Sequence, residues 1–347
     1  MSTASLCSSS LLLLGSLLLW GCTACSPSSP AATSAGDRAA APPGDGEGAD
    51  PTCGLPGGPR RGLLVAGSGA NLALVRHIAE RFVAHHPQIP VEVPPSIGTS
   101  GAVRAVLDGV VDIGLTSRRL KAAERSAGLL EIPLARVAVV VALAARRSEP
   151  APEAIEPELL CAVLNGEERR WPDGRPIIPL LREPGDSSNE VLRAGLPCFA
   201  AALEQAYASR RWRICITDQE MELALAQTQG SIGFSDQGTL ALGPARAWAR
   251  ALRLGTLAPG GAAVRAGSYP LTKDLGFITL GPPTGAAAAF IRFAGSPAAR
   301  DLFGTGGYVP LSEAAPGGAW QPADLPGGGS SAADGAWAPL PALPGEE

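Results

Sequence analysis

Short apolar segments alternate with segments of helical spacing along residues 62–312, and this alternation constrains the fold more than any other feature of the sequence. Four apolar segments are expected to form strands: 63–66, 90–93, 111–115 and 136–144. Between the first two, apolar residues recur at the spacing of one helix face: Leu72, Val75, Ile78 and Phe82. Strands joined by helices in this way predict an α/β fold in which a mostly parallel sheet carries helices on both faces.

Two helices in the second half of the chain are expected from their capping residues. Ser187 and Glu190 have the spacing of a capping box, and so do Thr217 and Glu220. The second half therefore continues the pattern of strands and helices.

The N-terminal residues predict export. The apolar run 11–19 is about half as long as a bilayer span requires, and it fits the hydrophobic region of a signal peptide, although no Lys or Arg precedes it. The run ends in Leu19-Trp20-Gly21-Cys22, which resembles a bacterial lipobox. This resemblance implies that residues 1–22 are a lipoprotein signal peptide and that Cys22 carries the lipid. The alternative is a buried N-terminal helix.

Two segments are expected to lie outside the folded region. Residues 23–61 are dominated by Ser, Pro, Ala and Gly, and residues 313–347 carry runs of Pro and Gly. Such segments bury too little apolar surface to offset the entropy lost on ordering. We expect the first to be a flexible tether between lipid and domain, and the second to be a loose C-terminal tail.

The composition excludes several kinds of site. The net charge is -4, whereas nucleic-acid-binding proteins need a basic surface, so we expect no nucleic-acid partner. Histidine occurs only at positions 77, 85 and 86, and no C-x-x-C pair remains after processing, so we expect neither a metal site nor a cofactor. Export permits disulfides, and Cys198 with Cys215 could form one, a pairing that the sequence leaves open.

Three loops rich in Gly, Ser and Thr follow apolar strands and precede expected helices: 67–71, 98–101 and 182–189. A helix N-terminus offers unpaired backbone N–H groups and a partial positive charge, and hydroxyl groups add further donors. Any one of these loops is explained by a helix cap alone. Three of them, together with Ser117-Arg118 after the third strand, predict a shared anion site.

Five stretches resemble, in the same order, the periplasmic phosphate-binding proteins of ABC importers, which belong to the type II periplasmic-binding-protein superfamily. They are Gly98-Thr99-Ser100-Gly101 and residues 111–118, 182–188, 230–234 and 307–310. The resemblance covers residues 63–310 and implies a two-lobed fold that closes around its ligand by a hinge motion. Lobe one is expected to hold residues 62–140 and 268–312, and lobe two residues 141–267.

The resemblance also implies a function. The chain is expected to capture inorganic phosphate in the cleft between the lobes and to deliver it to an ABC permease in the membrane. It is expected to be a monomer, not an enzyme, and to be lipid-anchored on the periplasmic or cell-surface face of a membrane. The ligand-binding residues that the resemblance implies are Ser68, Asn71, Leu72 through its backbone N–H, Thr99, Ser100, Gly101, Ser117, Arg118, Arg182, Asp186, Ser187 and Ser188. For Arg118 the alternative is a salt bridge to Glu124 or Glu131.

Two positions depart from the family pattern. Many members carry Asp where Ser117 stands, and that carboxylate accepts the proton of hydrogen phosphate, which sulfate lacks. The usual Gly-Ser-Gly-Thr is here Gly185-Asp186-Ser187-Ser188. Asp186 is therefore either a replacement proton acceptor or the N-cap of the following helix.

The sequence leaves three alternative functions open. The absence of a carboxylate after the third strand is compatible with a binder of molybdate, tungstate or sulfate. A sensor or adhesin on the same scaffold would keep the fold without the transport role. Gly185-Asp186-Ser187 is similar to the nucleophile block of one class of hydrolases, but no histidine follows His86 to act as the base.

Overall fold

The computed structural model describes residues 62–146 and 148–314. The expected signal peptide with Cys22, the expected tether up to residue 61 and residues 315–347 of the expected tail lie outside the described residues. No helix in the described part is long and apolar enough to cross a bilayer.

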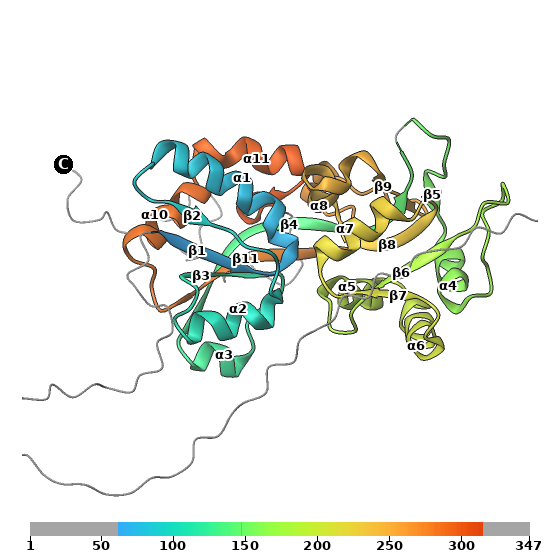
Figure 1. Ribbon diagram of the computed structural model, residues 1–347, viewed down its shortest axis with the longest axis horizontal. Helices are drawn as coiled ribbons and strands as arrows, with labels where there is room; N and C mark the ends of the chain where they lie inside the picture. The colour runs from blue at the N-terminus through green and yellow to red at the C-terminus, as the bar shows by residue number, and fades with distance from the viewer. Residues whose placement is uncertain (1–61, 147, 315–347) are drawn as a thin grey trace, which may run out of the picture. The chain divides into compact units, whose positions relative to one another are not determined.

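One sheet runs through the described region (Figure 1). Its strands are β1 (Leu63–Gly67), β2 (Val91–Glu92), β3 (Ile113–Thr116), β4 (Leu129–Ala144), β6 (Ile178–Arg182), β7 (Arg213–Cys215), β8 (Ser231–Asp236), β9 (Ala249–Ala251), β11 (Thr272–Leu280) and β12 (Val309–Pro310). Their spatial order is β2-β1-β3-β11-β4-β8-β6-β7, and β9 and β12 also pair with β4. A separate pair consists of β5 (Ala154–Ile155) and β10 (Arg253–Leu254).

The strand pairing in this sheet is mixed. β1 pairs in parallel with β2 and β3, and β6 pairs in parallel with β7 and β8. β4 and β11 are antiparallel to all of their neighbours. The expected α/β fold is confirmed. The sheet is mixed and not mostly parallel as expected, because the antiparallel strands β4 and β11 join the two parallel sets.

Helices cover both faces of the sheet (Figure 1). They are α1 (Gly69–His85), α2 (Gly98–Leu107), α3 (Ala122–Ser126), α4 (Pro157–Asn165), α5 (Ser187–Gly195), α6 (Phe199–Ser209), α7 (Asp218–Gln227), α8 (Gln237–Leu242), α9 (Gly261–Ala266), α10 (Gly285–Ala294) and α11 (Arg300–Gly306). α2 packs on β1 and β3 from one side, while α1 packs with α10 and α11 on the other. The expected arrangement of helices on both faces is therefore present.

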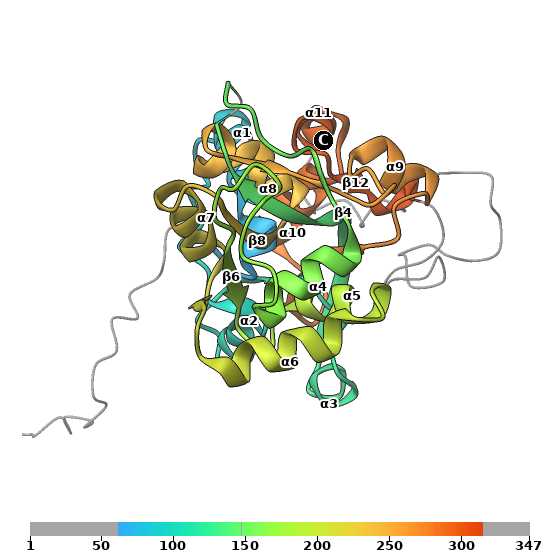
Figure 2. The same cartoon turned by 90° about the vertical axis from the view of Figure 1, so that its right-hand side faces the viewer.

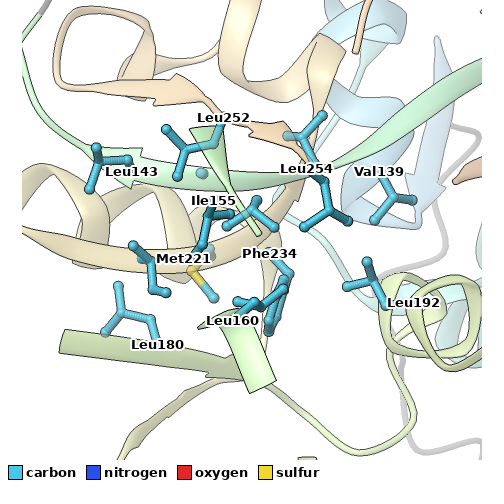
Figure 3. Packing of buried hydrophobic residues seen from close by; sticks show 14 of the residues in the cluster. Val139, Leu143, Ile155, Leu160, Leu180, Leu192, Met221, Phe234, Leu252 and Leu254 are labelled. Atoms are coloured by element: carbon cyan, nitrogen blue, oxygen red, sulfur yellow. The ribbon is translucent and has the colours of Figure 1, made fainter. Parts of the chain in front are cut away.

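Two large clusters of buried apolar side chains divide the described region, and the switch between them lies inside β4. Val137 belongs to the cluster formed with α1, β1 and α10, whereas Val139 belongs to the cluster shown in Figure 3. The chain returns from the second cluster to the first between Leu271 and Leu275. These switches lie close to the expected lobe boundaries, which stay a prediction.

β4 is longer than the strand expected at 136–144. Its additional residues pair with the second half of β11, and the register shifts where Gly276 lies opposite Pro133. Proline has no N–H to donate, so a sheet accepts it at such an irregularity. The second half of β4 is buried along its whole length, and its continuous apolar run is the part that the sequence revealed.

Of the two expected capping boxes, the one at Thr217 is present in its cap, while the Glu220 carboxylate accepts from the Ile216 N–H (2.9 Å) and not from the Thr217 N–H. Thr217 caps α7, because its hydroxyl accepts a hydrogen bond from the Glu220 N–H (3.1 Å). The N-cap of α5 is Asp186, which accepts from the Ser188 N–H (2.9 Å), and Ser187 is the first helical residue. The capping box expected at Ser187 is therefore wrong by one position, since Asp186 supplies the capping oxygen.

A disulfide joins Cys161 of α4 to Cys198 at the start of α6, with Cα atoms 6.2 Å apart. The pairing of Cys198 with Cys215 that the sequence left open is wrong, because Cys215 is a free, buried thiol at the end of β7. α4 and α6 pack against each other (Figure 2), and this packing brings the two bonded cysteines within reach.

Candidate functional site

Three hydroxyl groups, each at the start of a different helix, lie around the hydroxyl of Ser117, which follows β3. Ser117 Oγ accepts a hydrogen bond from Ser68 Oγ (3.0 Å) and lies 3.1 Å from Ser187 Oγ. Thr99 Oγ1 accepts from the Ser117 N–H (3.2 Å) and lies 3.5 Å from Ser117 Oγ. The three Gly, Ser and Thr-rich loops of the sequence are thus brought together at the residue that follows the third strand.

A buried ion cluster adjoins these hydroxyls. Arg182, the last residue of β6, contacts Asp186 Oδ2 (2.7 Å) and Asp218 Oδ2 (3.4 Å), and its side chain is only 3% exposed. Asp218 begins α7 and lies against Gly69, where a Cβ atom would be 2.0 Å from Asp218 Oδ2. Only glycine at position 69 allows this close approach.

These contacts close into a circuit, here called the polar ring: Ser68, Ser117, Ser187, Asp186, Arg182 and Asp218. Its members are joined by hydrogen bonds, by ion pairs or by adjacency in the chain. The ring is completed by the contact of Asp218 with Gly69, the residue that follows Ser68. The helices α1, α5 and α7 begin at this ring, and α2 begins at the neighbouring Thr99 loop. Helix N-termini favour negative charge, and they add positive potential to a ring whose own side chains are two carboxylates and one guanidinium.

Arg182 has hydrogen-bonding capacity that the described residues leave unused. Its Nη2 contacts both carboxylates, whereas Nε and Nη1 are buried without a partner in the described chain. Burial disfavours the charge of Arg182, but Asp218 and Asp186 outweigh this effect and raise its pKa further above the usual value. A buried cation with unpaired N–H groups requires an acceptor, and an oxyanion would provide one.

Asp186 is ionised in this setting. Burial favours its neutral form, but the charges of Arg182 and Lys273 outweigh burial and hold the pKa of Asp186 below its usual value. Its oxygens already accept from Arg182 and from the Ser188 N–H. The N-cap role is therefore observed, and the role as a proton acceptor stays a prediction.

Comparison with known protein families agrees with this architecture. Residues 28–298 match the family model of the PBP superfamily domain. The chain belongs to the PBP superfamily. A search of the curated proteins finds no match.

Solved structures include several proteins with the PBP fold seen here. One, from Clostridium perfringens, is named as a putative phosphate ABC transporter substrate-binding protein and was solved with bound phosphate. It is 18% identical, with a TM-score of 0.60 over 72% of this chain and 99% of that one. A phosphate-binding protein from Stenotrophomonas maltophilia is 14% identical, with a TM-score of 0.51 over 73% of this chain and 91% of its own. A human phosphate binding apolipoprotein is 14% identical, with a TM-score of 0.52 over 72% of this chain and 91% of its own. At these identities the likeness establishes the PBP fold.

Three charged residues beside the polar ring of this PBP chain were not expected from its sequence. Lys273 Nζ donates to Ser188 Oγ (3.1 Å) and lies 3.7 Å from Asp236 Oδ2. Burial raises the pKa of Asp236 to about 6, although Lys273 opposes the shift, and burial raises the pKa of Glu222 to about 7. No group of His, Cys, Asp and Glu in the described chain is arranged to hold a metal ion.

The sequence held a signal for two of these residues. Asp236 ends an apolar strand, as do other residues of the site, and Glu222 lies one helical turn after Asp218 on the same helix. Lys273 gives no such signal, because its partners lie far away in the sequence.

Arg118 does not belong to the polar ring. Its guanidinium donates to both oxygens of Glu124 at 2.9 Å, so the structure contains the salt bridge that was the alternative for this residue. A pocket of about 430 Å³ opens beside the ring, with Ser117, Arg118, Ser187 and Lys273 in its lining.

Four further expected residues also lie apart from the ring. Asn71 Nδ2 donates to the Gly276 carbonyl of β11 (3.3 Å). The Leu72 side chain is buried in the core, and its backbone N–H lies beyond the groups that the first turn of α1 leaves open. Ser100 and Gly101 lie in the first turn of α2, with Ser100 exposed.

Proposed function

We propose that this chain is an extracytoplasmic solute-binding protein that captures inorganic phosphate at the polar ring and delivers it to an ABC importer. The observation that carries the proposal is the buried Arg182, whose Nε and Nη1 have no partner in the described chain. The ring takes Ser68 and Ser117 from the expected lobe one, and Arg182 and Ser187 from the expected lobe two. An anion bound there would join the two lobes.

Phosphate matches the donors around the ring. A tetrahedral oxyanion offers acceptors in several directions. The donors available are the Arg182 N–H groups, the hydroxyls of Thr99 and Ser187, and the helix N-termini. The Clostridium protein was solved with bound phosphate, and the Stenotrophomonas and human proteins are named as phosphate-binding. These neighbours support phosphate as the ligand here.

Selectivity for phosphate over sulfate requires an acceptor for the phosphate proton. We propose Asp186 for this role, because its lowered pKa keeps it deprotonated and each of its carboxylate oxygens, which accepts one hydrogen bond in the structure, has the capacity for a second. Asp218, the other carboxylate that contacts Arg182, is the alternative acceptor.

A binder of molybdate, tungstate or sulfate is the second candidate function. It is favoured by the Ser117 hydroxyl, at a position where many family members carry Asp.

Arg182→Lys tests the proposed ligand contact. Lysine keeps the charge beside Asp186 and Asp218 but loses the planar fork of donors, so we expect phosphate affinity to fall on the order of 100-fold. Arg175→Lys is the matched control, because Arg175 is solvent-exposed and bound to Asp173. Titration calorimetry on both variants gives the affinities, and wild-type affinity in Arg182→Lys would refute the proposed contact.

The membrane attachment in this proposal rests on the lipobox at Cys22. Metabolic labelling with an alkyne fatty acid is expected to mark the wild-type chain in the membrane fraction and to leave Cys22→Ser unlabelled. Equal labelling of the wild-type chain and Cys22→Ser would exclude Cys22 as the site of lipid attachment.

A further inference from the structure

We propose that Lys273 is a positioning residue for oxyanion binding, acting through the Ser188 hydroxyl; the inference rests on the proposed function. Lys273 lies near the start of β11, where the chain returns from one buried cluster to the other. It is 4% exposed. It comes from a strand, whereas every member of the polar ring comes from a loop or from the end of a helix or strand.

The Ser188 hydroxyl is the group that Lys273 controls. Nζ of Lys273 donates to Ser188 Oγ at 3.1 Å. An ammonium group has donors and no acceptor, so Ser188 must accept in this bond, and its own hydroxyl hydrogen is left for another acceptor. The Ser188 backbone N–H already serves the Asp186 cap. The hydroxyl hydrogen is therefore the donor that Ser188 has left for an anion.

Asp236 holds the ammonium group in this position. Its Oδ2 lies 3.7 Å from Lys273 Nζ, while its Oδ1 accepts from the Thr239 N–H (2.8 Å) at the start of α8. The ion pair with Asp236 at 3.7 Å offsets the buried charge of Lys273. The hydrogen bond of Nζ is made to Ser188 at 3.1 Å. The ammonium also strengthens Ser188 as a donor, because hydrogen bonds in a chain polarise one another.

The choice of lysine in this chain supports a specific role. The sequence has 28 basic residues, and lysine occurs only at positions 121 and 273. Lys121 is exposed, whereas Lys273 is buried and borders the pocket that also contains Ser117 and Ser187. A compact ammonium directs separate N–H donors towards a hydroxyl and a carboxylate, whereas a guanidinium holds its donors in one rigid planar fork. Although the chain otherwise uses arginine, an arginine is therefore not expected to replace the lysine at this position.

A double-mutant cycle in phosphate affinity tests the inference. Lys273→Met and Ser188→Ala are each expected to weaken phosphate binding by about 10- to 100-fold, the range for a hydrogen bond to a charged group. If Lys273 acts through Ser188, Lys273→Met in the Ser188→Ala background weakens binding less than about threefold further. Lys273→Arg is expected to bind phosphate as weakly as Lys273→Met does. Lys121→Met is the control, and its phosphate affinity is expected to equal that of the wild type.

Folding and the proposed function are tested separately in the same experiment. Lys273→Met alone leaves the buried Asp236 carboxylate without its cation, which could impair folding. The double variant Lys273→Met/Asp236→Asn replaces that carboxylate by a neutral amide, so it is expected to fold and still to bind phosphate weakly. Losses from Lys273→Met and Ser188→Ala that multiply independently would overturn the inference, as would wild-type affinity in Lys273→Met. A wild-type chain that binds none of phosphate, sulfate, molybdate and tungstate would overturn the proposed function and, with it, the inference.

Discussion

Glu222 and Asp236 are buried carboxyl groups whose proton binding differs between the folded and the unfolded chain. Burial raises the pKa of Glu222 to about 7 and that of Asp236 to about 6, above the usual values of 4.5 and 3.8. The folded chain therefore takes up protons at a higher pH than the unfolded chain does. The contribution of these two groups to the free energy of unfolding rises as the pH falls from above 7 towards 5.

Glu222→Gln is expected to remove part of this pH dependence. Between pH 7.5 and 5.5, protonation of Glu222 contributes about 2 kcal/mol to the free energy of unfolding, and the variant should lack that gain. Urea unfolding of wild type and variant at the two pH values measures the difference. Glu204→Gln on the exposed face of α6 is the control. The same gain on acidification in wild type and Glu222→Gln would contradict the assignment.

Asp186→Asn tests the proposed proton acceptor at the residue scale. Asparagine still caps a helix, so the start of α5 should be kept. The neutral amide loses the charged acceptor, and phosphate affinity is expected to fall about 10- to 100-fold while sulfate affinity changes less. Calorimetric titrations with both anions give the ratio, and Asp173→Asn, in a solvent-exposed pair with Arg175, is the control. An unchanged phosphate-to-sulfate ratio in Asp186→Asn would exclude this residue, and Asp218→Asn would then be the next variant.

At this scale the sequence located the residues that follow strands and precede helices. Ser68, Thr99, Ser117 and Ser187 meet because the loops that carry them lie at the ends of strands in one sheet. Lys273 was missed because its partner Ser188 is 85 residues away and no local pattern connects them. Such a contact depends on how the whole chain is folded.

At the scale of elements, the Cys161–Cys198 disulfide fixes α4 to α6. The bond closes a loop with a sequence separation of 37 residues, and the entropy of that loop in the unfolded chain corresponds to about 4 kcal/mol. Cys161→Ala/Cys198→Ala is expected to lower the free energy of unfolding by this order. Urea unfolding measures the loss, and Cys215→Ala, which removes a free thiol, is the control. Equal stability of the double variant and the wild type would contradict a stabilising disulfide.

The same scale shows why element boundaries were harder to predict than element types. The strand expected at 136–144 begins at Leu129, because the earlier residues are held by pairing with β11 and not by a continuous apolar run. Asp186 replaced Ser187 as the cap of α5, since two neighbouring side chains both had the chemistry of a cap. In both cases a contact outside the local pattern decided the boundary.

At the scale of the whole molecule, the proposed function depends on an anion that joins two parts of one chain. β4 contributes side chains to both buried clusters. The chain crosses back from one cluster to the other between Leu271 and Leu275, at the start of β11. The ring contact Ser117–Ser187 and the contact of Asp218 with Gly69 link segments from the two parts. An anion held by both sets of donors would favour the arrangement in which they face one another.

Calorimetric titration of the wild-type chain with phosphate, sulfate, molybdate and tungstate, at one pH and one salt concentration, tests the central claim most directly. We predict one phosphate bound per chain, with an affinity at least about 100-fold higher than for the other three anions, because a site that accepts the phosphate proton leaves its acceptor unpaired with an anion that has none. Equal or tighter binding of sulfate, molybdate or tungstate, or binding of no oxyanion at all, would contradict it.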